Sequence, residues 1–182
     1  MRSWGWWSTG TGRSSMSSEK LHNDLLAARD RRQELLAGCL DHGYPATICL
    51  SLNIPGPDKS LPGGQGLFAW ALRSLAGAFP GWRMQRQPDD LLGPWGIMPL
   101  DLEAPEVKQR CMAVETAHPC GRLLDLDVYD ARARQVDRAS LALPPRPCLV
   151  CGQAAGECIR LGRHAMQEIR ERTDELLAHF RY

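Results

Sequence analysis

The sequence predicts an α+β fold, in which a single mixed or antiparallel sheet is packed with helices and a Cys-rich C-terminal turn precedes a long helix. Two observations lead to this prediction. Apolar residues recur at helical spacing near both ends of the chain, at 18–40 and 162–180, whereas short strand-like runs lie between them. Helices and strands alternate irregularly along the chain, which argues against a series of βαβ units.

The first helix is predicted at residues 18–40, because Gly43 and Pro45 end the helical pattern. Its apolar residues share one face: Leu21, Leu25, Ala28, Leu35 and Cys39. The apolar, β-branched run at 46–54 predicts a buried strand, and a loop rich in Pro and Gly follows it. A second helix is predicted at 65–79, with four apolar residues on one face: Phe68, Leu72, Leu75 and Phe79.

Short strands are predicted next, at 82–87 and 95–100, followed by a helix at 105–117 that begins with Pro105. The clearest strand of the chain is at 122–129, and residues 135–143 are expected to pair with it across a hairpin. The last helix is expected at 162–180, with apolar residues in one stripe: Ile169, Leu176, Leu177 and Phe180.

Length and composition limit the domain organisation and the classes of partner. The 182 residues fit one domain at 19–182, preceded by a Trp-, Gly- and Ser-rich stretch at 1–18. We expect that stretch to be a disordered extension with Met16 as the natural start, a Trp-mediated contact being the alternative. A net charge of +1 argues against a nucleic-acid partner. The sequence has no apolar stretch long enough to span a membrane. The absence of a signal-peptide pattern predicts a cytoplasmic protein with reduced cysteines.

The strand at 122–129 carries Asp125 and Asp127, which should share one face because strand side chains alternate with period two. Their Cα atoms would then be roughly 6.5–7 Å apart. Neighbouring carboxylates repel each other unless a cation lies between them, and Mg²⁺ prefers such oxygen ligands. Gly121 would allow a backbone or a phosphate to approach, and Arg122 could turn toward a phosphate. A solvated amphipathic strand is the structural alternative, and glycosyltransferases also use a D-x-D pair.

Four potential metal ligands lie close together near the C-terminus: Cys148, Cys151, Cys158 and His164. Three thiols and one imidazole form a Cys₃His set that is typical of structural zinc, and C-x-x-C has the spacing of a zinc knuckle. Two other interpretations stay open. The cysteines could be small thiols that pack in the protein, or the C-x-x-C could be a redox pair, although no thioredoxin-like pattern surrounds it.

The segment GRLLDLDV resembles the G-R-L-x-D-x-D-V signature of the apo-citrate lyase phosphoribosyl-dephospho-CoA transferases, also called holo-citrate lyase acyl-carrier-protein synthases. SLNIPGPDKS is similar to the family's N-I-P-G-P loop, with Asp58 at a position where the family pattern leads us to expect an apolar residue. Glu115 followed by His118-Pro119 resembles an E-x-x-H-P stretch, and LPPRPCLVCG with the downstream Cys158 and His164 resembles the C-terminal signature. The resemblance runs from about residue 20 to the end of the chain.

The resemblance implies a nucleotidyltransferase that matures citrate lyase. Such an enzyme moves the 2'-(5''-triphosphoribosyl)-3'-dephospho-CoA group onto a serine of the acyl-carrier (γ) subunit and releases pyrophosphate. The related carrier of malonate decarboxylase is an alternative acceptor. Two other functions stay open: a D-x-D transferase that uses another nucleotide donor, and a non-catalytic zinc-knuckle interaction module.

The resemblance also implies roles for individual residues. Asp125 and Asp127 would hold Mg²⁺ on the triphosphate, while Arg122 and Lys59 would neutralise the leaving pyrophosphate. Positioning and charge neutralisation would then account for most of the catalysis.

Glu115 or His118 would accept the serine proton, or Glu115 would be a third metal ligand. Asn53 and Gly56 belong to the loop that would cradle the substrate, and Lys108 could bind phosphate. The loop has a plainer interpretation as an ordinary connector built of turn residues.

Overall fold

The computed structural model describes residues 18–56, 59 and 61–181. The predicted extension at 1–18 therefore lies outside the described residues except for Ser18, the first residue of α1. The elements follow in this order: α1 (Ser18–Leu40), β1 (Ala46–Leu52), α2 (Gly64–Ala78), β2 (Gln85–Arg86), β3 (Gly96–Leu100), α3 (Ala104–Thr116), the 3₁₀ helix η1 (Pro119–Leu123), β4 (Leu124–Asp130), α4 (Ala155–Arg160) and α5 (Met166–Ala178).

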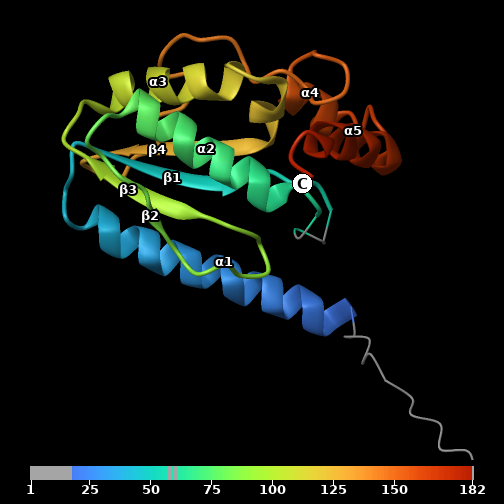
Figure 1. The fold of residues 1–182 in the computed structure, drawn as a ribbon, viewed down its shortest axis with the longest axis horizontal. Coiled ribbons are helices and arrows are strands. Elements are labelled where there is room, and N and C mark those ends of the chain that lie inside the picture. Colours follow the sequence, from blue (N-terminus) through green and yellow to red (C-terminus); the bar gives the residue numbers. More distant parts are fainter. Residues whose placement is uncertain (1–17, 57–58, 60, 182) are drawn as a thin grey trace, which may run out of the picture.

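Four strands of the described chain form one antiparallel sheet in the order β2-β3-β1-β4. Figure 1 shows α2 and α3 on one face of this sheet and α1 along the other, with α4 and α5 beyond one end. The predicted α+β class is confirmed, with the sheet antiparallel and the Cys-rich turn ahead of the C-terminal helix. β4 is an edge strand, so one side of its backbone is not covered by another strand of the sheet.

The main core lies between the sheet and the helices α2 and α3. Alternate residues of β4 supply it, namely Leu124, Leu126 and Val128, as the period-two pattern predicts. The buried Phe68 and Phe79 come from α2 and from the residue that ends it. Consequently the side chains at 125 and 127 lie on the other face of the sheet.

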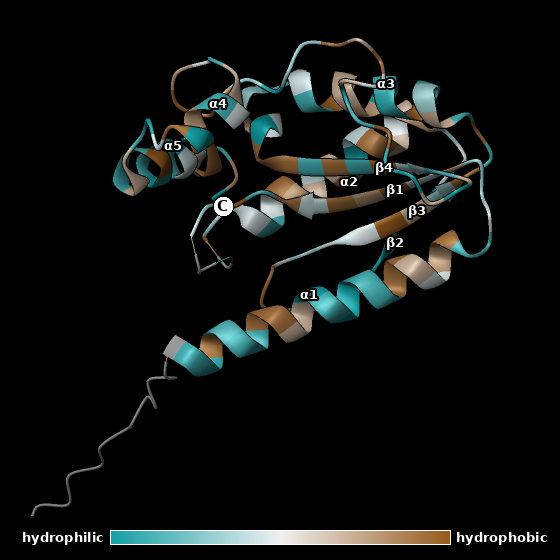
Figure 2. Cartoon of the chain, turned by 180° about the vertical axis from the view of Figure 1, so that it is seen from behind, coloured by the Kyte–Doolittle hydropathy of each residue, from teal (hydrophilic) through white to brown (hydrophobic). Residues whose placement is uncertain are grey.

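The helix α1 covers that other face only in part. A small cluster of Leu36, Trp95 and Ile97 joins it to the sheet, and a bidentate ion pair between Arg32 and Asp90 adds to the contact. The predicted contribution of Leu35 was wrong, because Leu35 is 51% exposed and Leu36 faces the sheet instead. Figure 2 shows hydrophilic residues over much of α1, in agreement with this narrow contact.

The predicted hairpin strand at 135–143 was wrong. Only Gln135 bridges to Tyr129 of β4, and Val136 N–H donates to the Val128 carbonyl at 2.7 Å. The chain then turns away, because the carboxylate of Asp137 accepts the Ser140 N–H and closes a turn. The remaining edge of β4 is therefore free for side chains to bind.

The C-terminal region also differs from the prediction. The last helix begins at Met166 and not at 162, and a separate short helix, α4, precedes it. Gly162 has a left-handed φ of 55°, which is typical of the residue just after a helix end. None of the helices in the described part of the chain is long and apolar enough to cross a membrane.

Candidate functional site

Asp125 and Asp127 share one face of β4 and line the same cavity of about 430 Å³. The cavity lies between β4, two side chains of α3 (Lys108 and Glu115) and the loop that follows the strand. Burial and the neighbouring charge of Asp125 both raise the pKa of Asp127. A cation that enters the cavity would stabilise the ionised form of this carboxyl group.

Two guanidinium groups from the loop after β4 surround the acidic pair. Arg138 forms an ion pair with the buried Glu115 at 2.7 Å, and Arg146 lies 3.9 Å from the same carboxylate. Arg146 also approaches Asp125 at 3.5 Å between Nη1 and Oδ1. The cavity therefore combines four carboxylates with three cations, a composition suited to a polyanion bound through a metal ion.

Two cationic side chains that line the cavity bind backbone carbonyls along the unpaired edge of β4. Lys108, which is buried, donates from Nζ to the Leu126 carbonyl at 2.7 Å, and Arg146 donates to the Leu124 carbonyl. Gln135 donates to Oδ1 of Asp127 at 2.6 Å. These bonds hold the strand and its acidic side chains in place from the side.

A second, more apolar cavity of about 540 Å³ lies next to the first, and Arg146 lines both. Asn53 and Arg122 provide polar groups at its wall, while the Cys-rich segment and the start of α5 supply most of the rest. Burial and the nearby charge of Arg146 lower the pKa of Arg122 to about 10. Its Nε and Nη1 are buried without a hydrogen-bond partner among the described residues.

Other predicted residues lie outside the two cavities. His118 packs among Trp70, His179 and Phe180, and its Nδ1 accepts the N–H of Cys120 at 3.2 Å. It lines neither cavity in the described part of the chain.

Gly121 allows a close approach of two backbone segments, since a Cβ there would lie 2.3 Å from the Glu115 carbonyl oxygen. Gly56 has a left-handed φ of 88° and lies beside Arg170 of α5. Lys59 donates to the Ile54 carbonyl, and burial followed by the charge of Arg29 lowers its pKa. Residues 57 and 58 of the same loop lie outside the described residues.

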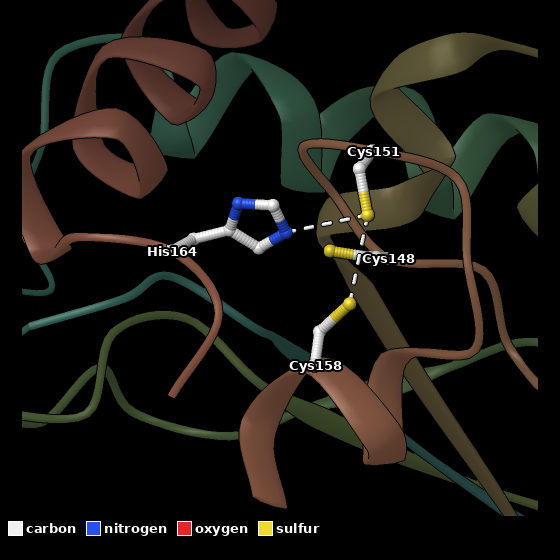
Figure 3. A group of neighbouring side chains, drawn as sticks. All are labelled: Cys148, Cys151, Cys158 and His164. Carbon is white, nitrogen blue, oxygen red and sulfur yellow. Dashed lines mark hydrogen bonds between the residues drawn. The ribbon is translucent and has the colours of Figure 1, made fainter. Parts of the chain in front are cut away.

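The four potential ligands of the C-terminal segment come together, as Figure 3 shows. The ligand atoms of Cys148, Cys151, Cys158 and His164 all lie within 4.8 Å of one another, so this group could hold a metal ion. Sγ of Cys151 lies 3.5 Å from Sγ of Cys158 and 3.3 Å from Nε2 of His164.

Sequence reasoning missed four polar side chains of the acidic cavity: Gln135, Asp137, Arg138 and Arg146. Arg146 lies in the LPPRPCLVCG segment, whose basic residue was a signal for anion binding near the cysteines. Arg138 and Gln135 carried no such signal, because their places depend on how the loop after β4 folds back over the strand.

Comparison with known proteins agrees with this geometry. The family model described as apo-citrate lyase phosphoribosyl-dephospho-CoA transferase matches residues 21–180. A protein of that name from Shigella flexneri serotype 5b (strain 8401) is 33% identical over 159 residues, covering 85% of this chain and 86% of its own length. Its namesake from Escherichia coli O139:H28 (strain E24377A / ETEC) matches to the same extent. The chain therefore belongs to the apo-citrate lyase phosphoribosyl-dephospho-CoA transferase family.

Proposed function

We propose that this protein transfers the phosphoribosyl-dephospho-CoA group from 2'-(5''-triphosphoribosyl)-3'-dephospho-CoA to a serine of the acyl-carrier subunit of citrate lyase, with release of pyrophosphate. The observation that carries the proposal is the shared cavity of Asp125 and Asp127, with Arg138 and Arg146 beside it, in a chain of this family. In the reaction the serine oxygen bonds to the phosphorus next to the ribose. The bond from that phosphorus to the pyrophosphate breaks, and the hydroxyl proton passes to water.

Asp125 and Asp127 are the residues that would hold Mg²⁺. Their fit to this ion rests on the donor set, which consists of two carboxylates in one polar cavity, and on the raised pKa of Asp127 due to burial and to Asp125. When bound, Mg²⁺ would supply charge neutralisation for the triphosphate oxygens. The protein's own task is to place these oxygens and the serine in line.

Arg146 is placed to bind the phosphate chain, because it lines both cavities and lies 3.5 Å from Asp125. We assign Glu115 to positioning, since it holds Arg138 at 2.7 Å and lies 3.9 Å from Arg146. An ion-paired carboxylate of this kind orients guanidinium groups toward the place where negative charge grows on the leaving pyrophosphate. We assign no proton transfer to His118, which packs among aromatic rings and lines neither of the two cavities described.

The apolar cavity would receive the dephospho-CoA part of the donor. Its walls include the aliphatic side chains of Leu149, Val150 and Ile169, which suit a pantetheine arm. Arg122 offers two buried guanidinium nitrogens without partners among the described residues, and these suit an anionic oxygen of the diphosphate. Asn53 lines the same wall, which supports a donor-binding role for the loop that follows β1.

The test is to incubate the protein with apo carrier, the triphosphoribosyl donor and Mg²⁺, and then to weigh the intact carrier by mass spectrometry. We expect a mass increase equal to the phosphoribosyl-dephospho-CoA group, dependent on the acceptor serine and on Mg²⁺. Asp125→Asn and Asp127→Asn should lower the rate at least about 100-fold, the scale on which charge stabilisation acts. Asp101→Asn is the matched control, because Asp101 is an exposed carboxylate between β3 and α3.

An unmodified carrier after incubation with the wild-type protein would overturn the proposed reaction. A carrier that gains the full mass with Asp125→Asn at the wild-type rate would overturn the metal-binding role of the pair while leaving the reaction itself in place.

A further inference from the structure

We propose that Cys148, Cys151, Cys158 and His164 bind one structural Zn²⁺ ion, and that this ion holds the segment carrying Arg146 in position between the two cavities. The proposal concerns the folded chain and does not depend on the reaction. It rests on the geometry of the four side chains in Figure 3 and on the hydrogen bonds of the segments that carry them.

The distances are close to those of a tetrahedral site. Zinc bonds of about 2.3 Å to sulfur and about 2.0–2.1 Å to nitrogen place neighbouring ligand atoms roughly 3.5–3.8 Å apart. Cys151 Sγ lies 3.5 Å from Cys158 Sγ and 3.3 Å from His164 Nε2, and no pair among the four exceeds 4.8 Å. Shifts of about 1 Å or less in the ligand atoms would therefore complete the tetrahedron. Four protein ligands would fill the coordination sphere, which is the mark of a structural site.

The exposure of the ligands argues against simple packing of thiols. Cys158 is buried, but Cys151 is exposed and both Cys148 and His164 are only half-buried. A cysteine that served as a small apolar side chain would be buried. Convergence of an exposed thiol, a second thiol and an imidazole at the surface is explained by a shared ion.

The backbone around the first two cysteines forms a compact turn. Cys148 N–H donates to the Gln153 carbonyl, Val150 N–H points to Cys148 Sγ at 3.4 Å, and Gly152 takes a left-handed φ of 73°. A backbone N–H that points to a ligand sulfur is the kind of outer contact that orients metal ligands. A helix N-terminus is one feature that activates C-x-x-C pairs, and here α4 begins only at Ala155, after both cysteines of the pair. These features favour zinc over a redox pair.

The ion would join three segments of the C-terminal region. Cys148 and Cys151 come from the turn, Cys158 from α4, and His164 from the link before α5. Arg146 is two residues before Cys148, and its carbonyl accepts the Ala155 N–H at 2.8 Å. Fixing the turn to α4 therefore fixes the backbone of Arg146, whose side chain lines both cavities.

The first test is to measure the metal content of the full-length protein by inductively coupled plasma mass spectrometry. The protein is purified without a histidine tag. We expect one zinc per chain in the wild type. The zinc content should be at least tenfold lower in Cys151→Ser and His164→Ala. Cys39→Ser is the matched control, because Cys39 is a half-buried thiol of α1 outside the group, and it should retain the metal. A wild-type protein without zinc, also after refolding with added zinc, would overturn the proposal.

Two further measurements cover the case in which a variant fails to fold. In the wild type, Cys151 should resist alkylation until a chelator removes the zinc, although it is exposed; equal alkylation before and after would contradict the site. Hydrogen exchange should rise at residues 144–165 on chelation and stay unchanged in β1 and β3. Unchanged exchange at 144–165 would refute the positioning of the Arg146 segment.

Discussion

Replacement of Gly121 by alanine tests whether the packing under the acidic strand is as tight as the structure has it. Gly121 lies in η1, three residues before β4 begins, and it contacts the end of α3. An added Cβ would lie 2.3 Å from the carbonyl oxygen of Glu115, 2.8 Å from its carbonyl carbon and 3.1 Å from its Cα. An ordinary carbon–oxygen contact is about 3.3 Å or longer, so the two backbones must separate by about 1 Å.

The surrounding hydrogen bonds resist this separation. Gly121 N–H donates to the His118 carbonyl at 2.9 Å, and the Leu123 carbonyl accepts the Asn53 N–H at 2.8 Å. No side-chain rotation relieves the clash, because the contacted atoms belong to the backbone. Overpacking of a core costs about 1–3 kcal/mol, and we expect a value of about 2–3 kcal/mol here. For a protein of this size, that corresponds to a fall in Tm of roughly 5–10 °C.

The assay is urea and thermal denaturation followed by circular dichroism, with Gly77→Ala as the control. A Cβ at Gly77, near the end of α2, would meet no described atom within 4 Å, so that variant should be equal to the wild type or more stable by up to about 1 kcal/mol. A Gly121→Ala protein with the wild-type unfolding midpoint would refute the packing argument, and with it the reason for a glycine at this position.

Two further predictions concern charged groups. Burial and then the charge of Asp125 raise the folded-state pKa of Asp127 above its unfolded value. Ionisation of this carboxyl therefore destabilises the folded protein, and this destabilisation is absent in acid and complete above the raised pKa. Asp127→Asn should therefore raise the free energy of unfolding of the metal-free protein near neutral pH but not in acid, and an equal effect at both pH values in urea denaturation would contradict this. Arg32→Lys should lower the free energy of unfolding by roughly 1–2 kcal/mol, because lysine cannot make the bidentate pair with Asp90. Arg86→Lys, at an exposed pair, should change it by less than about 0.5 kcal/mol, and equal losses in the two variants would refute the importance of the bidentate geometry.

Local patterns predicted the helices and strands where one face of an element is apolar. The period-two alternation at 124–128 determined which residues enter the core and which carry the acidic pair, because a strand in a sheet has only two faces. The helical stripe of α2 held for the same reason. Leu35 and Leu36 show the limit of this reasoning, since the position of the sheet decides which of two adjacent leucines is buried.

Residue identity and short spacing were enough to predict the family, the acidic pair and the ligand types of the Cys₃His group. Three other features became visible only in the folded chain: Arg146 lines both cavities, Glu115 pairs with Arg138, and His118 lines neither cavity. Local patterns could not predict them, because these contacts join segments that are distant along the chain. Their geometry depends on how a loop without regular structure folds over the free edge of β4, where side-chain donors, and not a fifth strand, bind the backbone carbonyls.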